Sequence, residues 1–114
     1  MLMRFPGGSS NTVSASYNQG IMSRLTEMLP KLGYTYFDWN VDSQDATGTQ
    51  TPQTIFENVV SGIGQREYSV VLQHDINKYS VDAVEKILVW GICNGYRFEA
   101  LTADSPTCHH PVFN

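Results

Sequence analysis

Short apolar runs alternate with longer amphipathic segments along this 114-residue chain. Four runs rich in apolar, aromatic and β-branched residues predict strands, at residues 1–3, 34–41, 68–74 and 96–101. Three intervening segments repeat apolar side chains at spacings of three and four, as amphipathic helices do, at residues 18–32, 51–64 and 80–94. Strands that alternate with helices call for parallel pairing with right-handed crossovers. The pattern therefore predicts an α/β fold with about four parallel strands and three helices.

Capping residues set the expected ends of the helices. Thr51 followed by Pro52 is typical of an N-cap and first helical position, so the second helix should begin there. Ser80 is expected to cap the third helix in the same way. In the first helix Pro30 falls in the last turn, and Gly33 is a natural left-handed stop.

Polar residues stand at the carboxyl ends of three predicted strands. Arg4 follows the first strand, Asp42 and Asp45 follow the second, and His74 ends the third. Catalytic groups of α/β folds lie outside the carboxyl ends of the strands, and histidine is a candidate general acid or base. Taken alone, His74 is explained as well by a strand-end histidine bonded to a neighbouring loop. Three clusters at equivalent places favour a shared site on one face.

The three clusters resemble motifs of a known family. Arg4-Phe5-Pro6-Gly7, Asp42-x-x-Asp45 and Leu72-Gln73-His74 match, in order, the third, fourth and fifth motifs of the polysaccharide deacetylases, the NodB-homology domain of family 4 carbohydrate esterases. A helix-sized segment separates each pair, and the resemblance covers nearly the whole chain. It implies a deformed (β/α) barrel of about seven strands, of which this chain would supply a partial barrel, the carboxyl-terminal half.

The resemblance implies a catalytic role for four residues. His74 matches the general acid that protonates the leaving amine or alkoxide, and Asp45 matches the carboxylate that orients and charges it. Arg4 matches the arginine that pairs with the catalytic base, and Gly7 occupies the position whose backbone N–H contributes to the oxyanion hole. From the residues alone, Asp45 is also explained as a turn residue of a polar loop; the motif match favours the catalytic role.

Substrate contacts are implied for other residues of the same motifs. Pro6, Leu72 and Asp42 fall at substrate-binding positions, and Leu72 matches the leucine that lines the pocket for the acetyl methyl group. Two positions depart from the family's pattern, because Gly7 stands where tyrosine is usual and Ala46 where tryptophan is usual. Both departures remove aromatic surface from the expected groove.

The family's first two motifs are missing from these 114 residues. They lie upstream of the arginine motif and supply the catalytic base and the metal ligands, as a Thr-Phe-Asp-Asp type and a His-x-x-x-His type sequence. The chain has three histidines, His74, His109 and His110, and contains neither an Asp-Asp pair nor the H-x-x-x-H spacing. We therefore expect no metal site and no cofactor in this chain. The resemblance implies a divalent, zinc-like metal only with the missing amino-terminal half, and an isolated chain that is inactive.

Composition and charge exclude several roles. The hydrophobic fraction of 41% and charged fraction of 16% suit a globular chain. A net charge of -4 and a pI of about 5.1 disfavour a nucleic-acid partner. No apolar run reaches the roughly 18 residues that a membrane span needs. The first residues lack the charged and apolar regions of a signal peptide. The family usually works outside the cytoplasm, on the cell wall or as a secreted enzyme, but this chain carries no address, so its location stays open.

The expected domain organisation is simple. Residues 1–103 should form the NodB-like half-domain and residues 104–114 a flexible tail, since chain ends are usually loosely held. Three consecutive ligands in Cys108-His109-His110 cannot easily close around one metal ion. A partial barrel leaves open strand edges and uncovered helix faces. We therefore expect either a homo-oligomer or pairing with the missing amino-terminal half.

Three functions remain open from the sequence. The first is the acid-bearing half of a peptidoglycan or chitin-type N-deacetylase, completed by an upstream segment or a second polypeptide and acting on acetylated polysaccharide. The second is a catalytically inactive, truncated product that folds as an oligomer and at most binds glycan. The third is an unrelated small α/β binding module, although neither glycine-rich phosphate-binding motif, G-x-G-x-x-G or G-x-x-x-x-G-K-[ST], is present.

Overall fold

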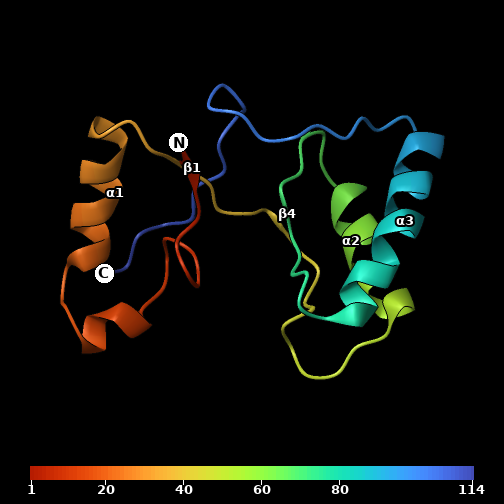
Figure 1. The fold of residues 1–114 in the computed structure, drawn as a ribbon, viewed down its shortest axis with the longest axis horizontal. Coiled ribbons are helices and arrows are strands. Elements are labelled where there is room, and N and C mark those ends of the chain that lie inside the picture. The colour runs from red at the N-terminus through yellow and green to blue at the C-terminus, as the bar shows by residue number, and fades with distance from the viewer. The chain divides into compact units, whose positions relative to one another are not determined.

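The computed structural model describes residues 1–114 and divides them into two compact units (Figure 1). The first unit consists of Met1–Asp38 and Leu101–Asn114, and the second of Trp39–Ala100. Four short parallel strands lie in two separate two-stranded sheets, accompanied by three α-helices. This confirms the predicted α/β class with about four parallel strands and three helices. None of the three helices has both the length and the apolarity that crossing a membrane requires.

The first unit is built on one strand pair and one helix. Strand β1 (Leu2–Met3) pairs in parallel with β2 (Thr35–Tyr36), and α1 (Ile21–Lys31) packs against β2. A short 3-10 helix, η1 (Val13–Ser16), precedes α1. Gly33 follows α1 with a φ of 88°, the left-handed conformation expected of a helix stop. The buried core consists of Phe5, Met22 and Tyr36.

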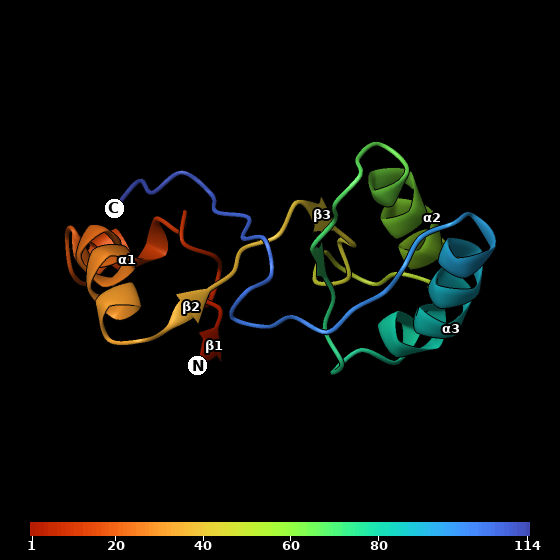
Figure 2. The same ribbon diagram turned by 90° about the horizontal axis from the view of Figure 1, so that it is seen from above.

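The second unit places two helices beside the other strand pair. Strand β3 (Val41–Asp42) pairs in parallel with β4 (Val71–Leu72). Helix α2 (Pro52–Ile63) packs against β3 and lies side by side with α3 (Lys78–Cys93), as Figures 1 and 2 show. Thr51 accepts the Thr54 N–H at 3.2 Å, which confirms the predicted N-cap of α2. The core consists of Val41, Ile55, Val59, Ile63, Ala83 and Ile87.

The single strand predicted over residues 34–41 is wrong. The segment divides into β2 and β3, which belong to different sheets and different units. The break contains Asp38, whose side chain is buried and accepts hydrogen bonds from Ser9 and from the backbone of His110. A buried carboxylate must satisfy its acceptors. These long-range bonds therefore override the β-propensity of the aromatic residues around Asp38.

The strand predicted over residues 96–101 does not form. Tyr96 instead stacks on Trp90 of α3, with ring centroids 5.5 Å apart. Phe98 covers Gly91 so closely that a Cβ at position 91 would lie 2.4 Å from its ring. Aromatic packing on the helix thus holds the beginning of this segment, and the segment joins no strand ladder.

Helix α3 also differs from its prediction. It begins at Lys78 after Asn77, so Ser80 is not its cap and instead lies buried in the first turn. Of the apolar side chains spaced three and four apart in this helix, Ile87 is buried, whereas Val84 and Leu88 are 40% and 38% exposed. The apolar pattern is therefore wider than the face that α2 covers.

The terminal residues, for which the sequence suggests a tail, pack within the first unit. The His109 ring stacks on Tyr36 with centroids 3.9 Å apart. The Asn114 side chain accepts the Gly20 N–H at 2.8 Å and donates to the Ser14 hydroxyl at 2.8 Å. Since Gly20 has no side chain with which to cap α1, Asn114 supplies the acceptor at the start of this helix.

Replacing Asn114 with alanine is expected to lower the free energy of unfolding by about 1–2 kcal/mol, because the side-chain hydrogen bonds to Gly20 and Ser14 are lost. Urea unfolding followed by circular dichroism measures the change. Phe113→Ala is the matched control, because Phe113 is 70% exposed. Equal midpoints for the two variants would contradict a stabilising role of the Asn114 side chain.

Candidate active site

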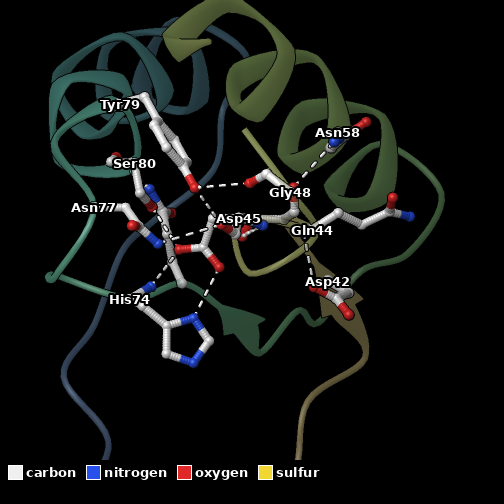
Figure 3. A network of polar contacts seen from close by, with 11 residues as sticks. Asp42, Gln44, Asp45, Gly48, Asn58, His74, Asn77, Tyr79 and Ser80 are labelled. Atoms are coloured by element: carbon white, nitrogen blue, oxygen red, sulfur yellow. Dashed lines mark hydrogen bonds and ion pairs between the residues drawn. The ribbon is translucent and has the colours of Figure 1, made fainter. Parts of the chain in front are cut away.

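A tight turn after β3 aims the carboxylate of Asp45. Asp42 Oδ1 accepts the Gln44 N–H at 2.8 Å, and the Ser43 hydroxyl accepts the Asp45 N–H at 3.3 Å. Gln44 has a φ of 60°, in the left-handed region that non-glycine residues rarely adopt. Asn58 of α2 donates to the Ser43 carbonyl at 3.0 Å. Asp42 is therefore the residue whose carboxylate stabilises the turn, and the Asp45 carboxylate points elsewhere (Figure 3).

The buried carboxylate of Asp45 is hydrogen-bonded to His74. Its Oδ1 lies 2.8 Å from His74 Nδ1, and its Oδ2 accepts the His74 backbone N–H at 2.5 Å. The Ser80 hydroxyl donates to the same Oδ2 at 2.7 Å. Figure 3 shows these groups converging from the loops after β3 and β4 and from the first turn of α3. The parallel register of β3 with β4 explains why the two loops meet.

The electrostatics favour an anionic Asp45. Burial by itself raises the pKa of this carboxyl, but the hydrogen bonds from His74 and Ser80 outweigh burial and hold the pKa below its usual range. Oδ1 of the ionised carboxylate can only accept a hydrogen bond, so His74 Nδ1 must be the donor. Nε2 is then the ring nitrogen that can exchange a proton. The His74 side chain is 29% exposed, which allows access from outside.

The predicted site residues divide between the two units. Asp42, Asp45, Leu72 and His74 lie together in the second unit, where Leu72 is half-buried in β4 and pairs in register with Asp42. Arg4, Pro6 and Gly7 belong to the first unit, where all three are exposed. Gly7 has a φ of 72° in the turn that the Gly8 N–H closes on the Phe5 carbonyl at 2.8 Å. The convergence of this turn with His74 stays a prediction.

Sequence reasoning missed the contribution of α3. Ser80 donates to the Asp45 carboxylate, while the Tyr79 hydroxyl and the Asn77 amide donate to the Asp45 carbonyl at 2.7 and 3.3 Å. These residues could have been found in the sequence from their position at the start of the helix that follows His74. In an α/β fold such a turn adjoins the carboxyl end of the preceding strand.

The residues of this chain do not form a metal centre. No group of three or more histidine, cysteine, aspartate or glutamate side chains is arranged to hold a metal ion. His74 Nδ1, a ring nitrogen that could coordinate a metal, is engaged with Asp45. We therefore assign no step of chemistry to a metal held by these residues.

A second cluster of serine, histidine and aspartate lies in the first unit. Ser9 donates to Asp38 through its N–H at 2.8 Å and its hydroxyl at 2.5 Å, and the His110 N–H donates at 2.9 Å. His110 Nδ1 lies 3.9 Å from Asp38 and 3.3 Å from the Ser10 hydroxyl. In a catalytic triad the serine and the carboxylate contact different ring nitrogens. Here both lie at Nδ1, which is not the arrangement of a catalytic triad, and the hydrogen bonds to Asp38 link Ser9 to His110.

An α/β fold with a carboxylate–histidine pair at its strand ends is an arrangement suited to acid–base catalysis. The chain aligns with the crystal structure of the catalytic domain of a peptidoglycan N-acetylglucosamine deacetylase from Eubacterium rectale, with 50% identity and a TM-score of 0.97. The alignment covers 99% of this chain and 52% of that one. A peptidoglycan-N-acetylglucosamine deacetylase of Bacillus cereus is 33% identical over 100 residues, which are 83% of this chain and 34% of that protein.

A comparison with protein-family models finds no match. The chain spans about half the length of the solved domain and about a third of the curated relative. It is nevertheless homologous to the catalytic domain of peptidoglycan N-acetylglucosamine deacetylases, over part of that domain. This confirms the resemblance to polysaccharide deacetylases that the three motifs indicated.

Proposed function

We propose that this chain is the acid-bearing half of a metal-dependent polysaccharide N-deacetylase that acts on peptidoglycan. The observation that carries the proposal is the His74–Asp45 pair, joined at 2.8 Å in a chain that is 50% identical to a peptidoglycan N-acetylglucosamine deacetylase domain. Both relatives are described as acting on peptidoglycan, which favours this substrate over chitin.

His74 serves as the general acid in this proposal. Asp45 stabilises the imidazolium and holds its Nδ1–H, so the proton at Nε2 is the one transferred to the leaving amine as the acetamide C–N bond breaks. Leu72 lines the pocket for the acetyl methyl group, and Asp42 and Pro6 shape the groove. The Gly7 N–H stabilises the oxyanion, and Arg4 pairs with the catalytic base.

The base and the metal belong, in this proposal, to a segment other than these 114 residues, either upstream or on a second polypeptide. A divalent, zinc-like metal bound there would polarise the acetyl carbonyl. A missing base costs a factor of about 10² to 10⁴ in rate, and a missing metal several kcal/mol of charge stabilisation. We therefore expect the isolated chain to release no measurable acetate.

A chimera tests the proposal. The chain would replace the matched 52% of the Eubacterium rectale domain, and the rest of that domain would be kept. We expect the chimera to release acetate from N-acetylglucosamine oligomers only when a divalent metal is present. The parent domain is the positive control, and the 114-residue chain the negative one. A folded chimera without activity, or metal-dependent acetate release by the chain alone, would contradict the proposal.

The alternative is a catalytically inactive oligomer that at most binds glycan. The observation that favours it is an exposed apolar stripe on α3, formed by side chains that are 38% to 67% exposed: Val81, Val84, Leu88 and Ile92. Such a surface fits a second copy of the chain as well as a missing half. Light scattering of the pure chain separates the two functions when combined with the chimera. A stable oligomer together with an inactive chimera would favour the alternative.

A further inference from the structure

Ser80 is fully buried in the first turn of α3, although the helix does not use it as a cap. Its hydroxyl donates to Asp45 Oδ2 at 2.7 Å. Its carbonyl accepts the Gln73 side-chain amide at 2.7 Å. Ser80 is thus tied to the carboxylate on one side and, on the other, to the residue that precedes His74.

We propose that Ser80 is a positioning residue, which holds the Asp45 carboxylate in the orientation that His74 requires. Together with the His74 backbone N–H, Ser80 holds Oδ2 and opposes rotation of the Asp45 side chain about its Cα–Cβ bond, away from His74. Oδ1 then faces His74 Nδ1, which keeps its proton, and Nε2 is presented to the substrate. The catalytic consequence rests on the proposed function of His74 as the acid.

The contacts around Asp45 separate this role from simple support of the loop. The Tyr79 hydroxyl, from the same helical turn, donates to the main-chain carbonyls of Asp45 and Gly48 at 2.7 and 3.2 Å and does not contact the carboxylate. Asn77 also reaches only the Asp45 carbonyl. His74 and Tyr79 are the titratable side chains that hydrogen-bond to Asp45, the first at the carboxylate and the second at the main-chain carbonyl. Tyr79→Phe therefore removes a hydroxyl from the turn while leaving the carboxylate contacts intact.

The pKa of the Asp45 carboxyl also depends on the hydrogen bond from Ser80. The hydrogen bond from Ser80 is one of the interactions that lower the pKa of the Asp45 carboxyl. Ser80→Ala should therefore raise this pKa toward its usual value. It should also let the Asp45 side chain populate other Cα–Cβ rotamers, because Oδ2 loses one of its two donors.

The test is NMR spectroscopy of the 114-residue chain. Three-bond couplings report the Asp45 side-chain rotamer, and ¹³C titration reports its pKa. We expect one dominant rotamer in the unsubstituted chain. In Ser80→Ala the population of other rotamers should rise by about fivefold, the effect of losing one hydrogen bond, and the titration midpoint should move up. Tyr79→Phe should change neither quantity, and Ser80→Thr, which keeps the hydroxyl, should restore both.

If Ser80→Ala leaves the rotamer populations and the titration midpoint of Asp45 unchanged, the inference is overturned. Should that variant fail to fold, the unsubstituted chain still decides the question. A hydroxyl proton of Ser80 held by Asp45 exchanges slowly enough to be observed, and rapid exchange would overturn the proposal. None of these measurements uses substrate, so an inactive chimera would refute the proposed function and leave the positioning of Asp45 to be judged separately.

Discussion

Replacing His74 with glutamine in the deacetylase chimera is expected to reduce kcat by about 10²- to 10⁴-fold, the contribution of a general acid. Glutamine can still donate to Asp45, so the hydrogen-bond network around Oδ1 can persist, but its amide cannot transfer a proton to the leaving amine. KM should change little, because the substitution removes an interaction made in the transition state. Steady-state acetate release measures both constants.

Asp75→Asn is the matched control for this prediction. Asp75 is the next residue in the same loop, is exposed, and has no place in the proposed mechanism. It should retain the kcat of the parent chimera. The double variant His74→Gln with Asp45→Asn adds a second check, since residues that act as a unit give non-additive losses. It should be about as slow as His74→Gln alone. A kcat for His74→Gln equal to that of the control would rule out the acid role.

The meeting of the loops that carry Asp45 and His74 could be predicted from general rules of α/β folds, whereas the pairing of the two side chains was implied by the motif resemblance. Two short apolar runs, with a helix between them, predict neighbouring parallel strands whose carboxyl ends meet. The structure places β3 beside β4 in that way and joins the two side chains across 29 positions of sequence. The start of helix α2 could also be predicted, because Thr51 and Pro52 are the residue types that begin helices.

Ser80 and Asp38 could not be assigned because their roles depend on distant partners. A serine near the start of a helix fits the capping rule, yet Ser80 donates to a carboxylate 35 positions away. The aromatic and β-branched residues around Asp38 predict a continuous strand, but its acceptors are satisfied by groups 29 and 72 positions away. Local propensity is a weak constraint wherever a buried charge needs partners.

Asp38→Asn is expected to lower the free energy of unfolding by about 1–3 kcal/mol, the cost of leaving a buried hydrogen-bond donor without its partner. Asparagine keeps one acceptor but turns an NH₂ group toward the donors from Ser9 or His110. One of these buried donors would then face the asparagine NH₂ group, which is also a donor, and would lose its hydrogen bond. Urea unfolding at neutral pH measures the loss. Asp104→Asn, at an exposed position of the same unit, should change stability little.

The pH dependence of stability gives the same prediction a second, independent readout. Burial raises the pKa of the Asp38 carboxyl, but the hydrogen bonds from Ser9 and His110 outweigh it and leave the pKa below the ordinary value of 3.8. A carboxyl whose pKa is lower in the folded state stabilises the fold above the unfolded-state pKa and loses that contribution as the pH falls through the folded-state pKa. The stability difference between the unsubstituted chain and Asp38→Asn should therefore be large at neutral pH and shrink in acid. If the stability difference stays constant from neutral pH down to strong acid, the charge of Asp38 does not contribute to its contacts with Ser9 and His110.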